Sequence, residues 1–220
     1  MPRREYMMKK CVILTPLYGG EEKDWLAAGP EDMLICADGG YDAALAAGLT
    51  PDLVVGDFDS MPDSHLAGCT CPIVRLPVHK DDTDTVVCLK EGRSRGYRRF
   101  IIAGTLGGRF DHTLSNVQVL YDCALRGEEA WLCDRQNRVR VLLPGEYTLE
   151  ALPGTHLSLL AWTERVTGID LSGTEWPLRN ATLTSRYPLG CSNNALEDTV
   201  RLRFVSGALV LVWSRENGTV

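Results

Sequence analysis

The sequence has no long hydrophobic run and no clear export signal. None of its apolar stretches approaches the roughly 20 residues that a membrane-spanning helix needs. A basic N-terminal segment, MPRREYMMKK, precedes the apolar run CVIL, but this run is too short for the core of a signal peptide. We therefore expect no membrane partner and a cytoplasmic location.

Positive charge is also scarce. The 220 residues carry 23 Lys and Arg against 29 Asp and Glu, a formal net charge of −6, and the basic residues form no long run. Nucleic acids and acidic membranes are bound through basic patches, so the composition argues against nucleic acid as a partner. Hydrophobic residues make up 45% of the chain, which fits a folded protein with one large or two modest cores.

The spacing of a zinc finger is absent as well. The eight cysteines fall mostly inside apolar runs, where a free thiol behaves as a small hydrophobic side chain. Only Cys69 and Cys71 are close in sequence, and one residue between them is not zinc-finger spacing. Free cysteines of this kind fit a reducing compartment. The chain also has no internal repeat and no low-complexity tract.

The first half of the chain alternates short apolar runs with polar or helical segments. This alternation predicts an α/β domain, with an open and mostly parallel sheet flanked by helices. The expected strands are residues 11–14, 33–37, 53–56, 73–76 and 100–103, and the expected helical segments are residues 21–28, 41–47, 82–92 and 111–126.

The run LVVG at residues 53–56 leads directly into Asp57, Phe58, Asp59 and Ser60. Branched apolar residues in succession are typical of a strand covered on both faces. From an extended segment Asp57 and Asp59 would point the same way, so both carboxylates could bind one cation. Taken alone, the same residues are equally typical of a polar turn after a strand.

Three other predicted strands also end in loops that carry aspartates. Because ligands bind beyond the carboxyl ends of the strands in an open α/β sheet, these loops should share one edge. The aspartates concerned are Asp38, Asp57, Asp59, Asp81, Asp84 and Asp111. So many carboxylates repel one another unless a cation neutralises them, which predicts a divalent metal. Taken singly, Asp81 is better explained as an acidic residue that caps the start of a helix.

A glycine-rich loop, residues 104–108, precedes Arg109 and the predicted helix 111–126. Glycines before a helix N-terminus expose backbone amides, and a guanidinium adds a planar set of donors, so the loop suits phosphate oxygens. It is neither a P-loop nor a dinucleotide-binding fingerprint. We interpret His112 as a helix-start residue rather than a ligand contact.

From residue 139 onward the pattern changes to short strands separated by glycine and proline, with no helical period. We therefore predict an α/β domain over residues 1–138 and an all-β, sandwich-like domain over residues 139–220. The expected strands are residues 139–143, 147–149, 156–162, 199–205 and 208–213. The last two should form a hairpin through Ser206-Gly207. Trp176 and Trp213 are candidates for stacking, although Trp213 is better explained as a core residue.

Four motifs carry a resemblance to a known family. They are Ala37-Asp38-Gly39-Gly40, Gly56-Asp57-Phe58-Asp59-Ser60, Lys80-Asp81-Asp82-Thr83-Asp84 and Gly107-Gly108-Arg109-Phe110-Asp111-His112. In this order and at this spacing they resemble the thiamine pyrophosphokinase family. In the β half the resemblance is mainly in layout and in Ser192-Asn193. The family often has an acidic residue next, whereas this chain has Asn194.

The resemblance implies transfer of a pyrophosphoryl group from ATP to the hydroxyl of thiamine, with Mg²⁺, giving thiamine diphosphate and AMP. It also implies a homodimer with thiamine near the subunit interface. An acidic cleft would suit the thiazolium cation of thiamine. Two alternatives remain open: a pyrophosphokinase for another small alcohol such as a pterin, and a non-catalytic nucleotide-binding regulator. A regulator would be expected to lack some carboxylates, and none of the four motifs has lost one.

The resemblance also implies roles for individual residues. Asp57, Asp59 and Asp84 are the expected metal ligands and catalytic carboxylates, with Asp81 assisting. The expected substrate contacts are Asp38, Gly39, Arg109, Asp111, Asn116, Ser192 and Asn193, and the expected phosphate or cofactor contacts are Gly107, Gly108, Thr83 and Ser60.

Overall fold

The structure is a computed structural model that describes residues 9–20, 26, 29–59, 63–79, 81–152 and 154–216. Its contacts divide the chain into two compact units. Unit 1 comprises Met1–Val119 and Arg126–Arg135, and unit 2 comprises Leu120–Leu125 and Gln136–Val220. Within the described residues, no helix combines the length and apolar character needed to cross a membrane. A domain boundary at residue 138 stays a prediction.

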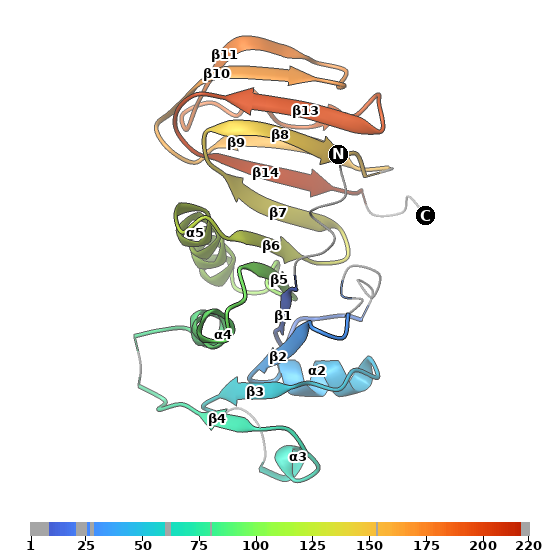
Figure 1. The fold of residues 1–220 in the computed structure, drawn as a ribbon, viewed down its shortest axis with the longest axis vertical. Helices are drawn as coiled ribbons and strands as arrows, with labels where there is room; N and C mark the ends of the chain where they lie inside the picture. Colours follow the sequence, from blue (N-terminus) through green and yellow to red (C-terminus); the bar gives the residue numbers. More distant parts are fainter. Residues whose placement is uncertain are drawn as a thin grey trace. The chain divides into compact units, whose positions relative to one another are not determined.

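Unit 1 is built on a parallel sheet in the strand order β6-β5-β1-β2-β3-β4 (Figure 1). Its strands are β1 (Cys11–Leu14), β2 (Met33–Ala37), β3 (Leu53–Gly56), β4 (Ile73–Arg75), β5 (Arg99–Ala103) and β6 (Glu129–Cys133). Strands β1 and β3 are buried along their whole length, as their unbroken apolar sequences require. Each large side chain so buried contributes about 2 kcal/mol of hydrophobic stabilisation. The predicted open parallel sheet is confirmed.

Helices α2 (Gly40–Ala46) and α4 (Asp84–Ser94) both pack on β1 and β2 and lie on opposite sides of the sheet in Figure 1. Unit 1 also contains α3 (Asp63–Leu66) and most of α5 (Phe110–Leu125). Helix α4 begins two residues later than predicted because the Thr83 hydroxyl caps it, accepting the Val86 N–H at 3.4 Å. The predicted helical segment 21–28 lies, apart from residue 26, outside the described residues.

Unit 2 contains two sets of antiparallel strands, so the predicted all-β, sandwich-like half is confirmed (Figure 1). One set has the order β12-β9-β14-β7 and the other has the order β11-β10-β13-β8. The strands are β7 (Asn137–Leu142), β8 (Gly145–Glu150), β9 (His156–Ala161), β10 (Arg165–Ser172), β11 (Leu178–Thr184), β12 (Asn193–Asn194), β13 (Thr199–Phe204) and β14 (Leu209–Ser214). Strands β10, β11 and β12 were not predicted.

The predicted hairpin of the last two strands is wrong. Strand β13 pairs with β8 and β10, whereas β14 pairs with β7 and β9, so the two strands lie in different sheets. Their connection at Ser206 bridges to Thr167, and a Cβ on Gly207 would lie only 2.3 Å from the Arg165 carbonyl oxygen. The glycine therefore permits close packing against β10 rather than a tight turn. Trp213 is 2% exposed, which confirms it as a core residue.

A close backbone approach fixes the loop that follows β5. Gly104 has φ of +79°, and a Cβ at this position would lie 2.3 Å from the backbone nitrogen of Tyr18. The Thr15 hydroxyl donates a hydrogen bond to the Gly104 carbonyl oxygen. The absence of a side chain at Gly104 thus lets the loops after β1 and β5 pack together.

We predict that Gly104→Ala lowers the free energy of unfolding by about 3 kcal/mol, because it adds overpacking to the cost of a left-handed backbone. Gly127→Ala is the matched control. Gly127 has φ of +71°, but a Cβ there would meet no atom within 4 Å, so only the conformational cost of about 1 kcal/mol applies. Urea denaturation compares the two variants, and equal losses would contradict this account of the packing.

Candidate functional site

The carboxyl ends of β2 and β3 bring Asp38 next to the loop that begins at Asp57. The two strands are parallel neighbours, and the Asp38 N–H donates to the Val55 carbonyl oxygen at 2.7 Å. A Cβ built on Gly56 would lie 3.0 Å from the Asp38 Cα and 3.2 Å from its Oδ1. A side chain at Gly56 would be crowded by Asp38, so the Asp38 carboxylate lies directly against the backbone that leads into Asp57.

The segment Asp57–Asp59 is not extended, so the prediction that an extended backbone points both carboxylates the same way is wrong. Phe58 has φ of +57°, in the left-handed region, and its ring is buried. The Asp59 N–H donates to Asp57 Oδ1 at 3.3 Å, as in a turn closed by an aspartate side chain. The Arg75 guanidinium stacks over the Phe58 ring at 5.3 Å from its centroid and helps to hold this turn.

Strained backbone marks the motifs that the sequence singled out. Among the described residues, four that are not glycine have positive φ: Asp38, Phe58, Asn180 and Ser192. Three of these four belong to the acidic motifs or to the Ser192-Asn193 step. Such conformations are costly and are concentrated at functional sites, where the surrounding structure holds them in place.

The next loop along the sheet leads from β4 into α4. Asp84 is the first residue of α4, where its charge complements the helix dipole. Thr83 was expected to contact phosphate, but its hydroxyl caps this helix. Asp81 is exposed, and Asp82 forms an ion pair with Lys90. Ser60, another expected contact, lies outside the described residues.

The glycine loop after β5 is open to solvent where phosphate binding was expected. Gly107 and Gly108 are exposed and have φ of +99° and +63°. Arg109 pairs with Asp111 through two hydrogen bonds, Nη2 to Oδ2 at 2.6 Å and Nε to Oδ1 at 3.2 Å. The hydrogen bond from Arg109 lowers the pKa of Asp111, so this carboxylate stays ionised further into acid than usual. The His112 N–H donates to Asp111 Oδ1, as suits a residue at a helix start.

Asn116, another expected substrate contact, is buried below this loop. Its Nδ2 donates to the Thr105 carbonyl oxygen at 3.3 Å, and only 7% of the residue is exposed. In this arrangement the side chain supports the backbone of the glycine loop from within the unit.

The acidic loops start from one edge of the sheet, but their described residues do not form a preassembled metal site. In the part of the chain that is described, no three His, Cys, Asp or Glu side chains group closely enough to hold a metal ion. Asp38 lies beside the Asp57 loop, whereas Asp111 is paired with Arg109. Carboxylate oxygens are the ligands that Mg²⁺ prefers, so the donor set fits this ion in its chemistry. The convergence of all six aspartates stays a prediction.

Unit 2 has a cavity of about 330 Å³ lined by leucines, Trp176, Ser192 and Asn193. The buried Asn193 side chain clamps the backbone of Trp176, because its Oδ1 accepts the Trp176 N–H at 3.1 Å and its Nδ2 donates to the Trp176 carbonyl oxygen at 2.8 Å. Trp176 itself is 54% exposed. The sequence makes Trp176 a candidate for stacking but does not place it among the expected site residues.

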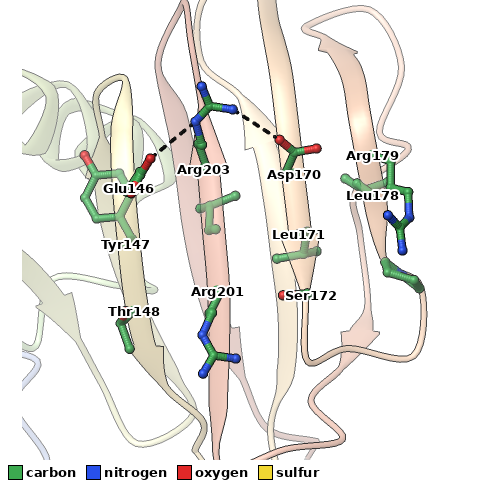
Figure 2. Close-up of a pocket in the computed structure, with 12 residues that line it drawn as sticks. Glu146, Tyr147, Thr148, Asp170, Leu171, Ser172, Leu178, Arg179, Arg201 and Arg203 are labelled. Carbon is green, nitrogen blue, oxygen red and sulfur yellow. Dashed lines mark hydrogen bonds and ion pairs between the residues drawn. The ribbon is translucent and has the colours of Figure 1, made fainter.

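A larger and more open cavity, about 650 Å³, lies on the β8-β13-β10-β11 sheet (Figure 2). Arg203 lies between Glu146 and Asp170 and pairs with the first at 3.4 Å and with the second at 3.5 Å. Arg201 lies between Thr148 and Ser172 in the strand register. None of the site residues predicted from the sequence lines this cavity.

Comparisons with known proteins found matches to both halves of the chain. Residues 27–132 match the model "Thiamin pyrophosphokinase, catalytic domain", and residues 146–209 match "Thiamin pyrophosphokinase, vitamin B1 binding domain". The thiamine pyrophosphokinase of Bacillus subtilis (strain 168) is 30% identical over 186 residues, which cover 83% of this chain and 87% of that protein.

Solved structures are similar over nearly the whole chain. The thiamine pyrophosphokinase from Bacillus subtilis superposes with a TM-score of 0.85 at 27% identity, covering 94% of this chain and all of that one. The thiamin pyrophosphokinase from Geobacillus thermodenitrificans gives a TM-score of 0.83 at 26% identity, covering 97% of this chain and all of that one. The chain therefore belongs to the thiamin pyrophosphokinase family.

Proposed function

We propose that this protein transfers the pyrophosphoryl group of ATP to the hydroxyl of thiamine, giving thiamine diphosphate and AMP. The observation that carries the proposal is the position of Asp38 against the strained Asp57–Asp59 turn, at the carboxyl edge of β2 and β3. This edge lies within the part of the chain that matches the catalytic-domain model. ATP is the co-substrate that membership of the family implies.

Asp57, Asp59 and Asp84 are the residues that would hold Mg²⁺, with Asp81 assisting. All of them follow strands β3 and β4, which are parallel neighbours, so their loops start from the same edge. When bound, the ion would supply charge neutralisation and orientation for the polyphosphate. The Asp59–Asp57 hydrogen bond and the buried Phe58 ring restrict the turn, which lowers the entropy that its carboxylates lose on binding a cation.

The glycine loop before α5 would bind phosphate oxygens. The exposed amides of Gly107 and Gly108 and the guanidinium of Arg109 provide the donors. Arg109 has five N–H donors and uses two groups, Nε and Nη2, on Asp111, so other donors can point to a phosphate. Asp38, Gly39 and Asp111 would line the nucleotide and the acceptor. Thr83 and Asn116 position the backbone around them.

Unit 2 would provide the binding site for thiamine. The 330 Å³ cavity combines an apolar lining with the Trp176 ring and the Ser192 hydroxyl, and its volume is in the range of small-molecule sites. An aromatic face attracts a cation, which suits a thiazolium ring. Asn193 acts here as a positioning residue, because it holds the backbone of Trp176. We further propose a homodimer with thiamine near the subunit interface, acting in the cytoplasm.

We predict that Asp57→Asn and Asp59→Asn each lower Mg²⁺-dependent AMP formation from ATP and thiamine by about a hundredfold or more, because phosphoryl transfer depends on charge neutralisation. The matched control is Glu91→Gln, which removes one carboxylate from an ion pair on the surface of α4. Circular dichroism should show all three variants folded. Turnover equal to the control in both aspartate variants would refute the assignment of these residues.

A panel that replaces thiamine by a pterin alcohol tests the acceptor.

We predict that Asn193→Ala raises KM for thiamine by about tenfold, or about 1.4 kcal/mol of binding, while KM for ATP stays unchanged. The reason is that three hydrogen bonds between this side chain and the backbones of Trp176 and Asn194 are lost. Tryptophan fluorescence anisotropy should fall as the Trp176 segment loosens. The control is Asn194→Ala. Among the described residues, the Asn194 side chain forms hydrogen bonds with Glu175 and His156 and none with Trp176. Equal effects of the two variants on both KM values would count against the clamp.

A further inference from the structure

Cys69 and Cys71 form a close pair of thiols in the turn between α3 and β4. Their Sγ atoms are 3.3 Å apart, and Cys69 Sγ also lies 3.6 Å from the Cys71 carbonyl oxygen. A disulfide has an S–S length of about 2.05 Å, so the sulfur atoms need to approach by only slightly more than an ångström. The intervening Thr70 is exposed, and the turn can therefore adjust without disturbing a packed core.

These are the two thiols of the chain that combine proximity with access. Cys69 and Cys71 are half-buried, whereas Cys11, Cys36, Cys88, Cys123 and Cys133 are fully buried. Cys191 is exposed but belongs to unit 2. Because oxidation requires that a small oxidant reach a sulfur atom, the pair in unit 1 is set apart from the other cysteines.

The surroundings of the pair favour thiol chemistry over metal binding. The buried Tyr41 forms a hydrogen bond with Cys69, and this contact adds to burial in raising the pKa of the tyrosine. Within the described residues, no third His, Cys, Asp or Glu completes a metal-binding group with the two thiols. Two sulfur atoms without a third ligand do not make a structural zinc site.

We propose that Cys69 and Cys71 are a modification site, at which a peroxide converts the dithiol reversibly to an intramolecular disulfide. The Cys69 sulfur takes one oxygen atom from hydrogen peroxide and becomes a sulfenic acid, with release of one water. The Cys71 sulfur then attacks the Cys69 sulfur, so that the S–S bond forms, the S–O bond breaks, and a second water leaves. The two thiols lose two electrons and two protons, and the peroxide is reduced to water.

The environment of Cys71 bears on the pH at which the pair reacts. Burial and the adjacent Cys69 thiol raise the pKa of Cys71 to about 11. A thiolate is the form that a peroxide oxidises and also the form that attacks a sulfenic acid, so the disulfide should form faster as the pH rises. A small thiol such as dithiothreitol reverses the reaction by thiol–disulfide exchange.

The test treats the full chain with hydrogen peroxide and measures intact mass, with Cys191→Ser as the background to prevent cross-linking between chains. We expect the protein to lose the mass of two hydrogen atoms and to regain it with dithiothreitol. Tandem mass spectrometry should locate the bond between Cys69 and Cys71. In the same background Cys71→Ser should gain the mass of one oxygen atom at Cys69 and form no internal disulfide. This readout does not depend on catalytic activity.

Cys36→Ala in the same background tests whether a buried thiol near the pair takes part in the reaction. Burial first, and then Cys71 and Cys69, raise the pKa of Cys36, so it lies near the pair. The disulfide should still form in Cys36→Ala. Loss of the bond in that variant, with the fold retained by circular dichroism, would overturn the assignment. So would a wild-type chain that gains oxygen atoms without losing two hydrogens.

Discussion

Parallel pairing is the constraint that determines where the chemistry of unit 1 can take place. Strands β5, β1, β2, β3 and β4 all run in the same direction, so every loop that leaves a carboxyl end starts from one edge. The loops can lie close together because glycine, which has no side chain, occupies the points of contact. Gly56 allows Asp38 to lie against the next strand, and Gly104 allows the loops after β1 and β5 to meet. Burial of the apolar strands thus holds a row of polar loops in place.

Most of the α/β half could be predicted from the sequence because its signals are local. Unbroken apolar runs such as residues 11–14 and 53–56 specify buried strands, and a glycine or an aspartate directly follows β2, β3 and β5. The β half was harder to predict. Strand β11 has only one fully buried residue among its seven, so its sequence carries little hydrophobic signal. The Ser206-Gly207 step looks like a hairpin turn in sequence. In the structure, however, β13 and β14 are buried in different sheets and pair with other strands.

Only part of the candidate site could likewise be predicted from the sequence. The edge that carries Asp38 and Asp57 could be predicted, because strand ends in a parallel sheet are set by chain direction. The conformation of the Asp57 turn could not, because Phe58 adopts a left-handed backbone that a bulky residue rarely takes without tertiary support. Neither could the roles of Thr83, Asn116 and Asn193. Each uses its side chain on the backbone, as a helix cap, a loop support or a clamp on Trp176, and sequence alone does not distinguish these from ligand contacts.

We propose that the carboxylates after β3 and β4 hold a divalent ion against the phosphates of ATP. A crystal structure with Mg²⁺, thiamine and a non-hydrolysable ATP analogue tests this most directly. We expect one or more ions bridging phosphate oxygens to the carboxylates of Asp57, Asp59 and Asp84, with the glycine loop before α5 on the phosphates. A nucleotide and ion bound away from these three carboxylates would contradict the account.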